Sequence, residues 1–188
     1  MTKRAEILSN EDYQKLLKNI DNPKHRLFLQ IARYTGERWG IIRLLKVSDV
    51  YTVSRVPSTH ISFCSRKTSP GSNKKTRQVP VCDRLQEELQ AYNLPINSGW
   101  LFFNRLNPSE PMSSKNADRF FHLALDRAGL GGKGYSTQST RRTLVERLVY
   151  SGVGLGVIQQ IIGIHDLGSF QFYLDIDDKQ LLDALSLI

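Results

Sequence analysis

Acidic residues are absent from one long stretch of this 188-residue chain, the whole segment between Asp49 and Asp83. The same segment contains a group of basic residues: Arg55, Arg66, Lys67, Lys74, Lys75 and Arg77. Over the full chain the formal net charge is +8 and the pI is about 9.6. A basic block on a folded domain attracts phosphate backbones, but a solvated basic surface without a partner gives the same pattern. Charge alone therefore leaves both interpretations open.

Cysteine is scarce as well, with only Cys64 and Cys82 in the sequence. His60 lies close to Cys64, but no second pair of ligands completes a zinc spacing, so we expect no metal site. We expect the two cysteines to be reduced, buried thiols of a cytosolic protein.

Long apolar runs are also missing. No run approaches the roughly 20 residues that span a bilayer, and the segment Met1–Glu6 lacks the apolar stretch of a secretory signal. These absences exclude a membrane partner from the expected functions and favour a cytoplasmic location. Of the residues present, 40% are hydrophobic, which suits one compact domain.

Helical periodicity covers most of the chain outside the basic block. Ser9 is a good N-cap for a first helix from Asn10 to about Ile20, and Pro23 suits the first turn of a second helix that Gly36 ends. Further helices are predicted over residues 39–45, 83–91, 114–128, 139–150, 155–162, 170–174 and 178–187. The core stripe predicted for 114–128 consists of Phe120, Phe121, Leu123 and Ala124.

The pattern changes to β between Val50 and Val81. Three segments are predicted as strands: Tyr51–Val53, His60–Cys64 and Gln78–Val81. Pro80 places the third strand at a sheet edge or a strand end, and the basic segment 67–75 before it is predicted as a loop. The predicted fold class is α+β, mainly α, with a small antiparallel sheet near residues 50–81.

Two arginines and a tyrosine, far apart in the sequence, carry most of the chemical information. Arg38 ends the run Tyr-Thr-Gly-Glu-Arg, Arg141 begins Arg-Arg-Thr, and Tyr173 lies in Phe-Gln-Phe-Tyr-Leu. Two guanidiniums that converge can clamp a phosphate, because each presents a planar fork of donors. A tyrosine beside such a clamp can attack phosphorus and hold it covalently. This combination can cut and rejoin DNA without metal or ATP.

These motifs resemble the catalytic domain of the tyrosine recombinases, the phage-integrase family, over nearly the whole chain. Five of them stand in the family's order: Tyr34–Arg38 followed by Leu44–Val50 (first arginine motif), Lys67 before Arg77–Val81 (hairpin lysine), Arg141–Thr143 (second arginine box), Gly152–Gly163 (the stretch before the family's glycine–histidine pair) and Tyr173 (the nucleophile's position).

The resemblance implies a mechanism without a cofactor. Tyr173 would attack a backbone phosphorus and form a 3′-phosphotyrosine, while Arg38 and Arg141 stabilise the charge on the non-bridging oxygens. Lys67 would protonate the leaving oxygen. Histidines would help to move the tyrosine proton, because a phenol with an ordinary pKa of about 10 is a poor nucleophile unaided.

The resemblance also implies double-stranded DNA as the partner and a nucleoid-associated location. The DNA-binding side chains would include Arg66, Lys74, Lys75, Arg77 and Arg142. Residues 1–188 would form the catalytic domain alone, without the family's N-terminal core-binding domain. The leucine face of 178–188 would allow this segment to pack on a neighbouring protomer, which predicts a homo-oligomer on DNA.

Three positions depart from the family pattern. Gln138 stands where the second arginine box normally begins with histidine, and Ile164 follows Gly163 where the family has histidine, with His165 one place later. Ile41 replaces the usual acidic residue three positions after the first arginine. Glutamine can hydrogen-bond a phosphate but cannot act as a base near neutral pH. We therefore expect a recombinase whose cleavage is impaired or lost, with a specialised active enzyme as the alternative.

Several residues have a second interpretation. Arg38 could cap the preceding helix or pair with Asp49, and Tyr173 could be a core aromatic residue. His165 could be a surface turn residue. Lys67 competes with Lys74 and Lys75 as the active lysine, and all three could be solvated loop charges.

A different class of function is also open. Residues 144–163 have the outline of a helix, a glycine turn and a helix, which suits a DNA-binding regulator without chemistry. A protein-interaction domain is a third interpretation, which tight, salt-dependent DNA binding would exclude.

Overall fold

The computed structural model of the protein describes residues 4–64, 76–95 and 98–164, together with Gly168, Leu182, Leu185 and Ser186. Within these residues the elements are α1 (Asn10–Lys18), α2 (Pro23–Thr35), α3 (Trp39–Ile42), the 3₁₀ helix η1 (Val47–Asp49), β1 (His60–Cys64), β2 (Thr76–Pro80), α4 (Asp83–Ala91), α5 (Ser114–Arg127), α6 (Ser139–Tyr150) and α7 (Leu155–Ile162). The predicted class, mainly helical with a small antiparallel sheet, is confirmed.

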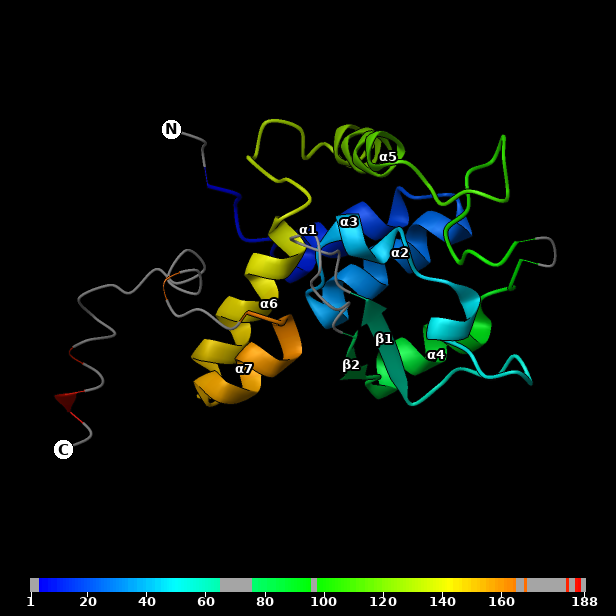
Figure 1. Ribbon diagram of the computed structural model, residues 1–188. Helices are drawn as coiled ribbons and strands as arrows, with labels where there is room; N and C mark the ends of the chain where they lie inside the picture. Colours follow the sequence, from blue (N-terminus) through cyan, green and yellow to red (C-terminus); the bar gives the residue numbers. More distant parts are fainter. Residues whose placement is uncertain are drawn as a thin grey trace.

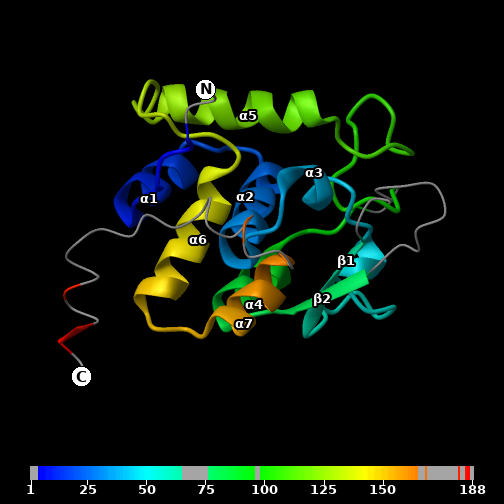
Figure 2. The ribbon, with the colours of Figure 1, turned by 60° about the vertical axis from the view of Figure 1, so that its left-hand side comes forward.

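Helix α2 occupies the centre of the molecule (Figure 1). Helix α5 runs along one edge, α6 and α7 lie on one side of α2, and the β-hairpin with α4 lies on the other (Figures 1 and 2). The central position explains the burial of consecutive α2 residues, from Leu27 to Arg33. Burying such side chains is the main favourable contribution to folding.

The helix ends follow the local signals in the sequence. The hydroxyl of Ser9 accepts the N–H of Asp12 at the start of α1 (3.0 Å), and that of Ser113 accepts the N–H of Asn116 at the start of α5 (3.1 Å). Gly36 ends α2 in the left-handed region, with φ 61°. α1 ends at Lys18, two residues before the predicted boundary, and α3 ends at Ile42, three residues before it.

The sheet consists of β1 and β2 paired antiparallel, with Ile61 opposite Val79 and Phe63 opposite Arg77. Ile61, Phe63 and Val79 are buried, so one face of the hairpin packs on the core. Strand β2 covers the predicted segment 78–81 in part and begins earlier, at Thr76.

The predicted strand Tyr51–Val53 is wrong. Tyr51 makes only an isolated bridge to Pro57, and the chain turns back between them, with the Thr52 N–H bonded to the Val56 carbonyl (2.8 Å). Proline has no N–H to continue a ladder of backbone hydrogen bonds, so pairing stops at one bridge. The Tyr51 side chain is buried and donates its hydroxyl to the Leu89 carbonyl (2.8 Å).

Two expectations about burial are also wrong. Leu123, predicted for the core stripe of α5, is 48% exposed, whereas Phe120, Phe121 and Ala124 are buried as predicted. Both cysteines, Cys64 and Cys82, are exposed rather than buried, and no disulfide joins them. The two cysteines lie at opposite ends of the β-hairpin, Cys64 at the end of β1 and Cys82 between β2 and α4.

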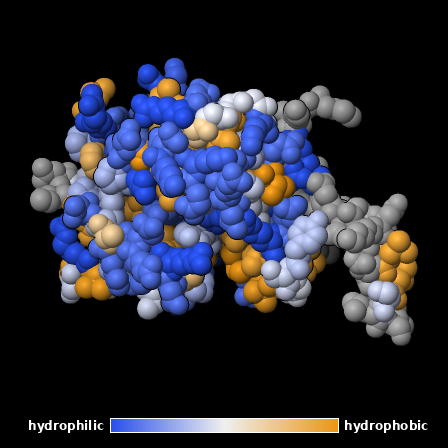
Figure 3. All heavy atoms as spheres, turned by 180° about the vertical axis from the view of Figure 1, so that it is seen from behind, coloured by the Kyte–Doolittle hydropathy of each residue, from blue (hydrophilic) through white to orange (hydrophobic). Residues whose placement is uncertain are grey.

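A second, smaller apolar cluster joins α6 to α7 and consists of Val145, Ile158, Ile162 and Ile164. The face seen from behind in Figure 3 is largely hydrophilic, as expected for a face in contact with water. In the part of the chain that the structure describes, no helix is long and apolar enough to cross a membrane.

Candidate active site

Arg38 lies in the short loop between α2 and α3. Gly36 allows the loop to pass close to α6, because a Cβ atom at Gly36 would lie 2.8 Å from Cδ2 of Leu144 and its φ is positive. Arg38 itself is exposed, and its guanidinium makes no hydrogen bond or ion pair with any described residue. The alternative pairing with Asp49 is not observed, since Asp49 accepts the backbone N–H of Lys46 instead (2.8 Å).

Arg141 is buried near the start of α6, with 1% of its surface exposed. Its Nη1 donates to the Gly36 carbonyl (2.7 Å) and its Nη2 to the Ile162 carbonyl (2.8 Å). One guanidinium therefore connects the loop that carries Arg38 with the end of α7. The fold brings together the two arginine motifs, which are about 100 residues apart in the sequence.

Arg77 of β2 forms a second connection to the same loop. Its Nη2 pairs with Oε2 of Glu37, and its Nη1 donates to the Ile161 carbonyl and, at 3.3 Å, to the Gln160 carbonyl. Glu37 is 5% exposed, and its Oε1 accepts the backbone N–H of Arg38 (2.6 Å). The Glu37 carboxylate thus holds the Arg38 backbone and the β-hairpin in one arrangement.

The end of α7 is shaped by these contacts. The last carbonyls of a helix have no partners within the helix and carry the negative end of its dipole. Arg77 and Arg141 together bond to the carbonyls of Gln160, Ile161 and Ile162. Gly163 follows with φ 67°, and a Cβ atom there would lie 2.6 Å from Nε of Arg77. Two independent features therefore favour glycine at this position: the positive φ and the close approach of the Arg77 side chain.

The three departures from the family pattern have different surroundings. Gln138 is exposed at the N-cap of α6, one turn before Arg141, without a side-chain capping bond. Ile164 is 4% exposed and belongs to the apolar cluster between α6 and α7. Ile41 is half-buried and packs against the main core. A histidine could replace the exposed Gln138 without any repacking. A histidine at position 164 would instead place a polar ring in the apolar cluster between α6 and α7.

Arg142 was predicted as a structural residue or as a contact to the DNA backbone. Its side chain is 7% exposed and its Nη1 donates to the Ala5 carbonyl, so it ties the N-terminal segment to α6. The DNA contact stays a prediction. Arg77 was also predicted to contact DNA, and the structure shows it half-buried against Glu37. Sequence analysis did not single out Glu37, the acidic residue beside Arg38, as the partner of Arg77.

Several predicted site residues lie outside the residues that the structure describes: Tyr173, Lys67, His165, Arg66, Lys74 and Lys75. The same holds for the predicted helices 170–174 and, apart from Leu182, Leu185 and Ser186, 178–187. Their predicted roles remain predictions. Across the described ranges, no three histidine, cysteine or acidic side chains gather as metal ligands would.

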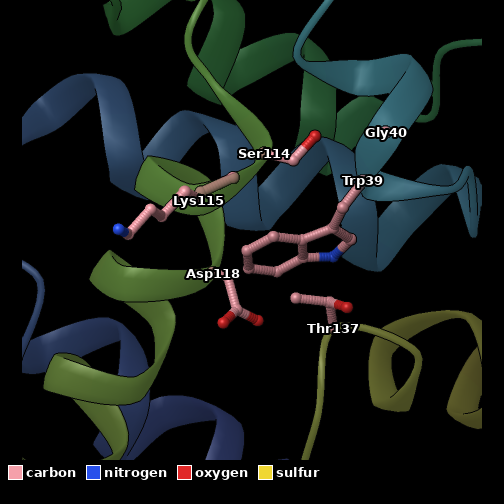
Figure 4. Close-up of a pocket in the computed structure, with 7 residues that line it drawn as sticks. Trp39, Gly40, Ser114, Lys115, Asp118 and Thr137 are labelled. Carbon is pink, nitrogen blue, oxygen red and sulfur yellow. The ribbon is translucent and has the colours of Figure 1, made fainter.

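A pocket of about 370 Å³ adjoins the arginine site (Figure 4). It lies between the start of α3, the first turns of α5 and the segment before α6, and its lining includes Trp39, Lys115, Asp118 and Thr137. Trp39 and Thr137 are the immediate neighbours of Arg38 and Gln138. The Trp39 indole donates to the Thr140 hydroxyl (3.2 Å), which fixes the ring against the start of α6.

Solved structures show the class of fold. The crystal structure of XerA recombinase matches with a TM-score of 0.74 at 20% identity and covers 98% of this chain and 66% of its own. A lambda integrase dimer bound to a COC′ core site matches with a TM-score of 0.66 at 19% identity, over 95% of this chain and 50% of its own. The protein has the fold of a tyrosine recombinase catalytic domain.

Sequence comparison shows the family. Residues 6–180 match the phage integrase family, and the chain belongs to it. A tyrosine recombinase of Pseudothermotoga lettingae is 24% identical over 185 residues, which cover 96% of this chain and 60% of the relative. The tyrosine recombinase XerA of Pyrococcus horikoshii is 24% identical over 181 residues, which cover 95% and 59%. The chain thus spans about three fifths of the length of these curated relatives.

Proposed function

We propose that this chain is the catalytic domain of a site-specific tyrosine recombinase or integrase, which cuts and rejoins double-stranded DNA through a 3′-phosphotyrosine at Tyr173. The observation that carries the proposal is the bond from Arg141 to the Gly36 carbonyl, two residues before Arg38. It holds the two arginine motifs of the family in one place, as a phosphate clamp requires.

The two arginines would have different tasks. Arg38 is exposed and unpaired among the described residues, so it is available to a non-bridging phosphate oxygen. Arg141 is buried and bonded to the Gly36 and Ile162 carbonyls through Nη1 and Nη2. Arg141 would therefore fix the geometry of the loop that presents Arg38 to the phosphate.

We propose further that proton transfer is the weak part of the site. Gln138 cannot accept a proton near neutral pH, and Ile164 is part of the apolar cluster. A missing general acid or base typically slows a reaction by about 10²- to 10⁴-fold. The burial of Ile164 also favours a second candidate, a DNA-binding regulator of the same family that has lost cleavage.

A strand-nicking assay separates the two candidates. A pool of nicked duplexes with randomised sequence around the nick traps the covalent intermediate, because the short 3′ fragment diffuses away after cleavage. We expect a slowly formed, detergent-resistant adduct with the wild-type chain and none with Tyr173→Phe. DNA binding without any adduct would favour the regulator, and an equal adduct in Tyr173→Phe would refute the assigned nucleophile.

The proposed homo-oligomer rests on the C-terminal segment. Leu182 and Leu185 are 66% and 67% exposed, and apolar side chains of this size favour a covering surface. Deleting residues 178–188 is expected to reduce the mass of the DNA complex measured by light scattering. An unchanged mass would count against a role of this segment in assembly.

A further inference from the structure

A second pocket, of about 290 Å³, lies at the start of α2, at the opposite end of that helix from Arg38, and its lining is basic. It lies between the start of α2, residues of the segment from Phe103 to Met112 and the first three turns of α5. Four basic side chains line it: Lys24, His25, Arg105 and Arg119. None of the described residues that line it carries a carboxylate. None of these basic residues belongs to the arginine, lysine or tyrosine motifs described above.

The positive charge of this pocket is not neutralised by the described part of the protein. Arg105 and Arg119 are exposed, and neither guanidinium forms a hydrogen bond or ion pair with a described residue. Arg127, two turns further along α5, gives the contrast, because it pairs with Asp21 (3.0 Å). Cations gathered in a concave site repel one another and attract an anion more strongly than scattered surface charges do.

The floor of the pocket is fixed. The Lys24 ammonium donates to the Phe103 carbonyl (2.8 Å) and lies 4.0 Å from the centre of the Phe103 ring. The His25 ring stacks on Phe120 with centroids 4.3 Å apart and planes 10° apart. Burial lowers the pKa of His25 to about 4, so the imidazole is neutral at pH 7 and offers one N–H. A floor held in this way binds a ligand without ordering new side chains.

We propose that this pocket binds a backbone phosphate of the DNA duplex whose scissile phosphate lies at Arg38 and Arg141. The inference rests on the proposed function and adds a second anchoring point to it. Two free guanidiniums, a lysine and the Asn116 amide suit a phosphate, and the apolar Phe103 and Leu123 beside them suit a deoxyribose.

The spacing of the two sites agrees with this assignment. Helix α2 has 13 residues and is therefore about 20 Å long. Along one strand of B-DNA this length corresponds to about six base pairs at 3.4 Å each. A duplex that contacts the arginine clamp extends past the pocket over this distance, so a backbone phosphate of one of its two strands can reach the pocket. An acidic peptide is the other macromolecule that would suit the charge, but the spacing gives no reason to expect it.

The salt dependence of DNA binding tests the proposal. Affinity for a random-sequence duplex of about 30 base pairs is measured at several salt concentrations, and the slope of log K against log salt falls by about 0.9 for each phosphate that the protein no longer neutralises. The Arg105→Ala/Arg119→Ala variant is expected to show a slope smaller by about 0.9 to 1.8. Lys18→Ala/Arg84→Ala removes two exposed charges from α1 and α4 that neither line the pocket nor belong to the arginine motifs, and it serves as the matched control.

Two further variants complete the design. Arg105→Lys/Arg119→Lys is expected to keep most of the slope, because a lysine still neutralises a phosphate. Arg38→Ala should lower the slope independently, and its effect should add to that of the alanine pair, because the two sites contact different phosphates.

The outcomes are distinguishable. If the wild-type chain binds the duplex but the alanine pair behaves like the control pair, the pocket is not a phosphate site, and an acidic protein partner becomes its interpretation. If the wild-type chain does not bind DNA at all, the proposed function itself fails.

Discussion

Three arginines meet around the loop that joins α2 to α3, and each is held differently. Arg38 is exposed, Arg141 is buried with two of its nitrogens on backbone carbonyls, and Arg77 is half-buried against Glu37. Only Arg38 has its whole guanidinium available within the described structure. The same residue type thus supplies one ligand-facing charge and two supports, and the supports determine where the first arginine lies.

Gly163 tests the contact with Arg77 against a matched glycine. Gly163→Ala places a Cβ atom 2.6 Å from Nε of Arg77 at φ 67°, whereas Gly152→Ala meets nothing within 4 Å at φ 71°. Both variants carry the left-handed strain, of about 1 kcal/mol. Gly163→Ala is expected to lose about 1–3 kcal/mol more in urea unfolding, because Arg77 must move. Equal losses in the two variants would show that Arg77 does not lie against Gly163.

The Glu37–Arg77 pair is tested by removing one charge. Glu37→Gln keeps the shape of the side chain but leaves the guanidinium of Arg77 without a carboxylate. We expect a loss of about 2 kcal/mol in the free energy of unfolding, below the usual range for a fully buried pair because Arg77 is partly exposed. The exposed Glu11–Lys15 pair (2.7 Å) provides the control, and Glu11→Gln should cost less than about 0.5 kcal/mol.

At the scale of elements, the helices could be predicted because their signals are local. Ser9, Ser113 and Gly36 mark helix ends by their own hydrogen bonds or backbone angle. The strand predicted at Tyr51–Val53 failed because the decisive fact, a turn that leads back to Pro57, is not visible in the strand's own composition. The predicted burial of Leu123 was wrong for a related reason. A stripe of apolar residues on a helix does not show how far the neighbouring elements extend to cover it.

The candidate site was predictable in part. The arginine motifs indicated which residues meet, and the fold brings the Arg38 and Arg141 segments together. Sequence alone did not show that Glu37 and Arg77 pair across about 40 residues, because such a pairing depends on how the hairpin packs against the loop. It also did not show that Arg142, adjacent to Arg141, points inward to the Ala5 carbonyl.

Restoring the family's histidines is expected to have opposite consequences at the two positions. Gln138 is exposed, so Gln138→His should leave stability within about 0.5 kcal/mol and raise the rate of adduct formation. Ile164→His places a polar ring in the α6–α7 cluster and should cost about 2 kcal/mol or more. Thermal unfolding and the nicking assay measure both. A stable Ile164→His protein would contradict the assigned packing of α7.

At the scale of the whole molecule, a buried carboxylate fastens the first helix to the glycine-rich segment before α6. Asp12 of α1 is 6% exposed and accepts bonds from the Lys133 ammonium (2.8 Å) and the Tyr135 hydroxyl (2.6 Å). These two bonds lower the pKa of Asp12. Burial, with the bond to Asp12, raises the pKa of Tyr135 to about 12. The contact holds together parts of the chain more than 100 residues apart.

This contact predicts an acid-sensitive component of stability. Because the pKa of Asp12 is lower in the folded state, its contribution is complete above the unfolded value, near 4, and is lost as the pH falls through the folded value. Asp12→Asn should therefore be less stable at pH 7 and lose less stability between about pH 4 and pH 2 than the wild type. Asp21→Asn, an exposed change, is the control. Identical acid profiles for wild type and Asp12→Asn would contradict this contribution.

The central claim, that the two arginine motifs form one site which neutralises a phosphate, is tested most directly by changing the charge of the phosphate itself. Single-turnover rates of adduct formation are measured on a nicked duplex with either a normal scissile phosphate or a neutral methylphosphonate. Arg38→Ala should slow the reaction at the phosphate by about 100-fold or more, and much less at the methylphosphonate, which has lost the charge that Arg38 neutralises. An equal loss on both substrates would contradict the claim.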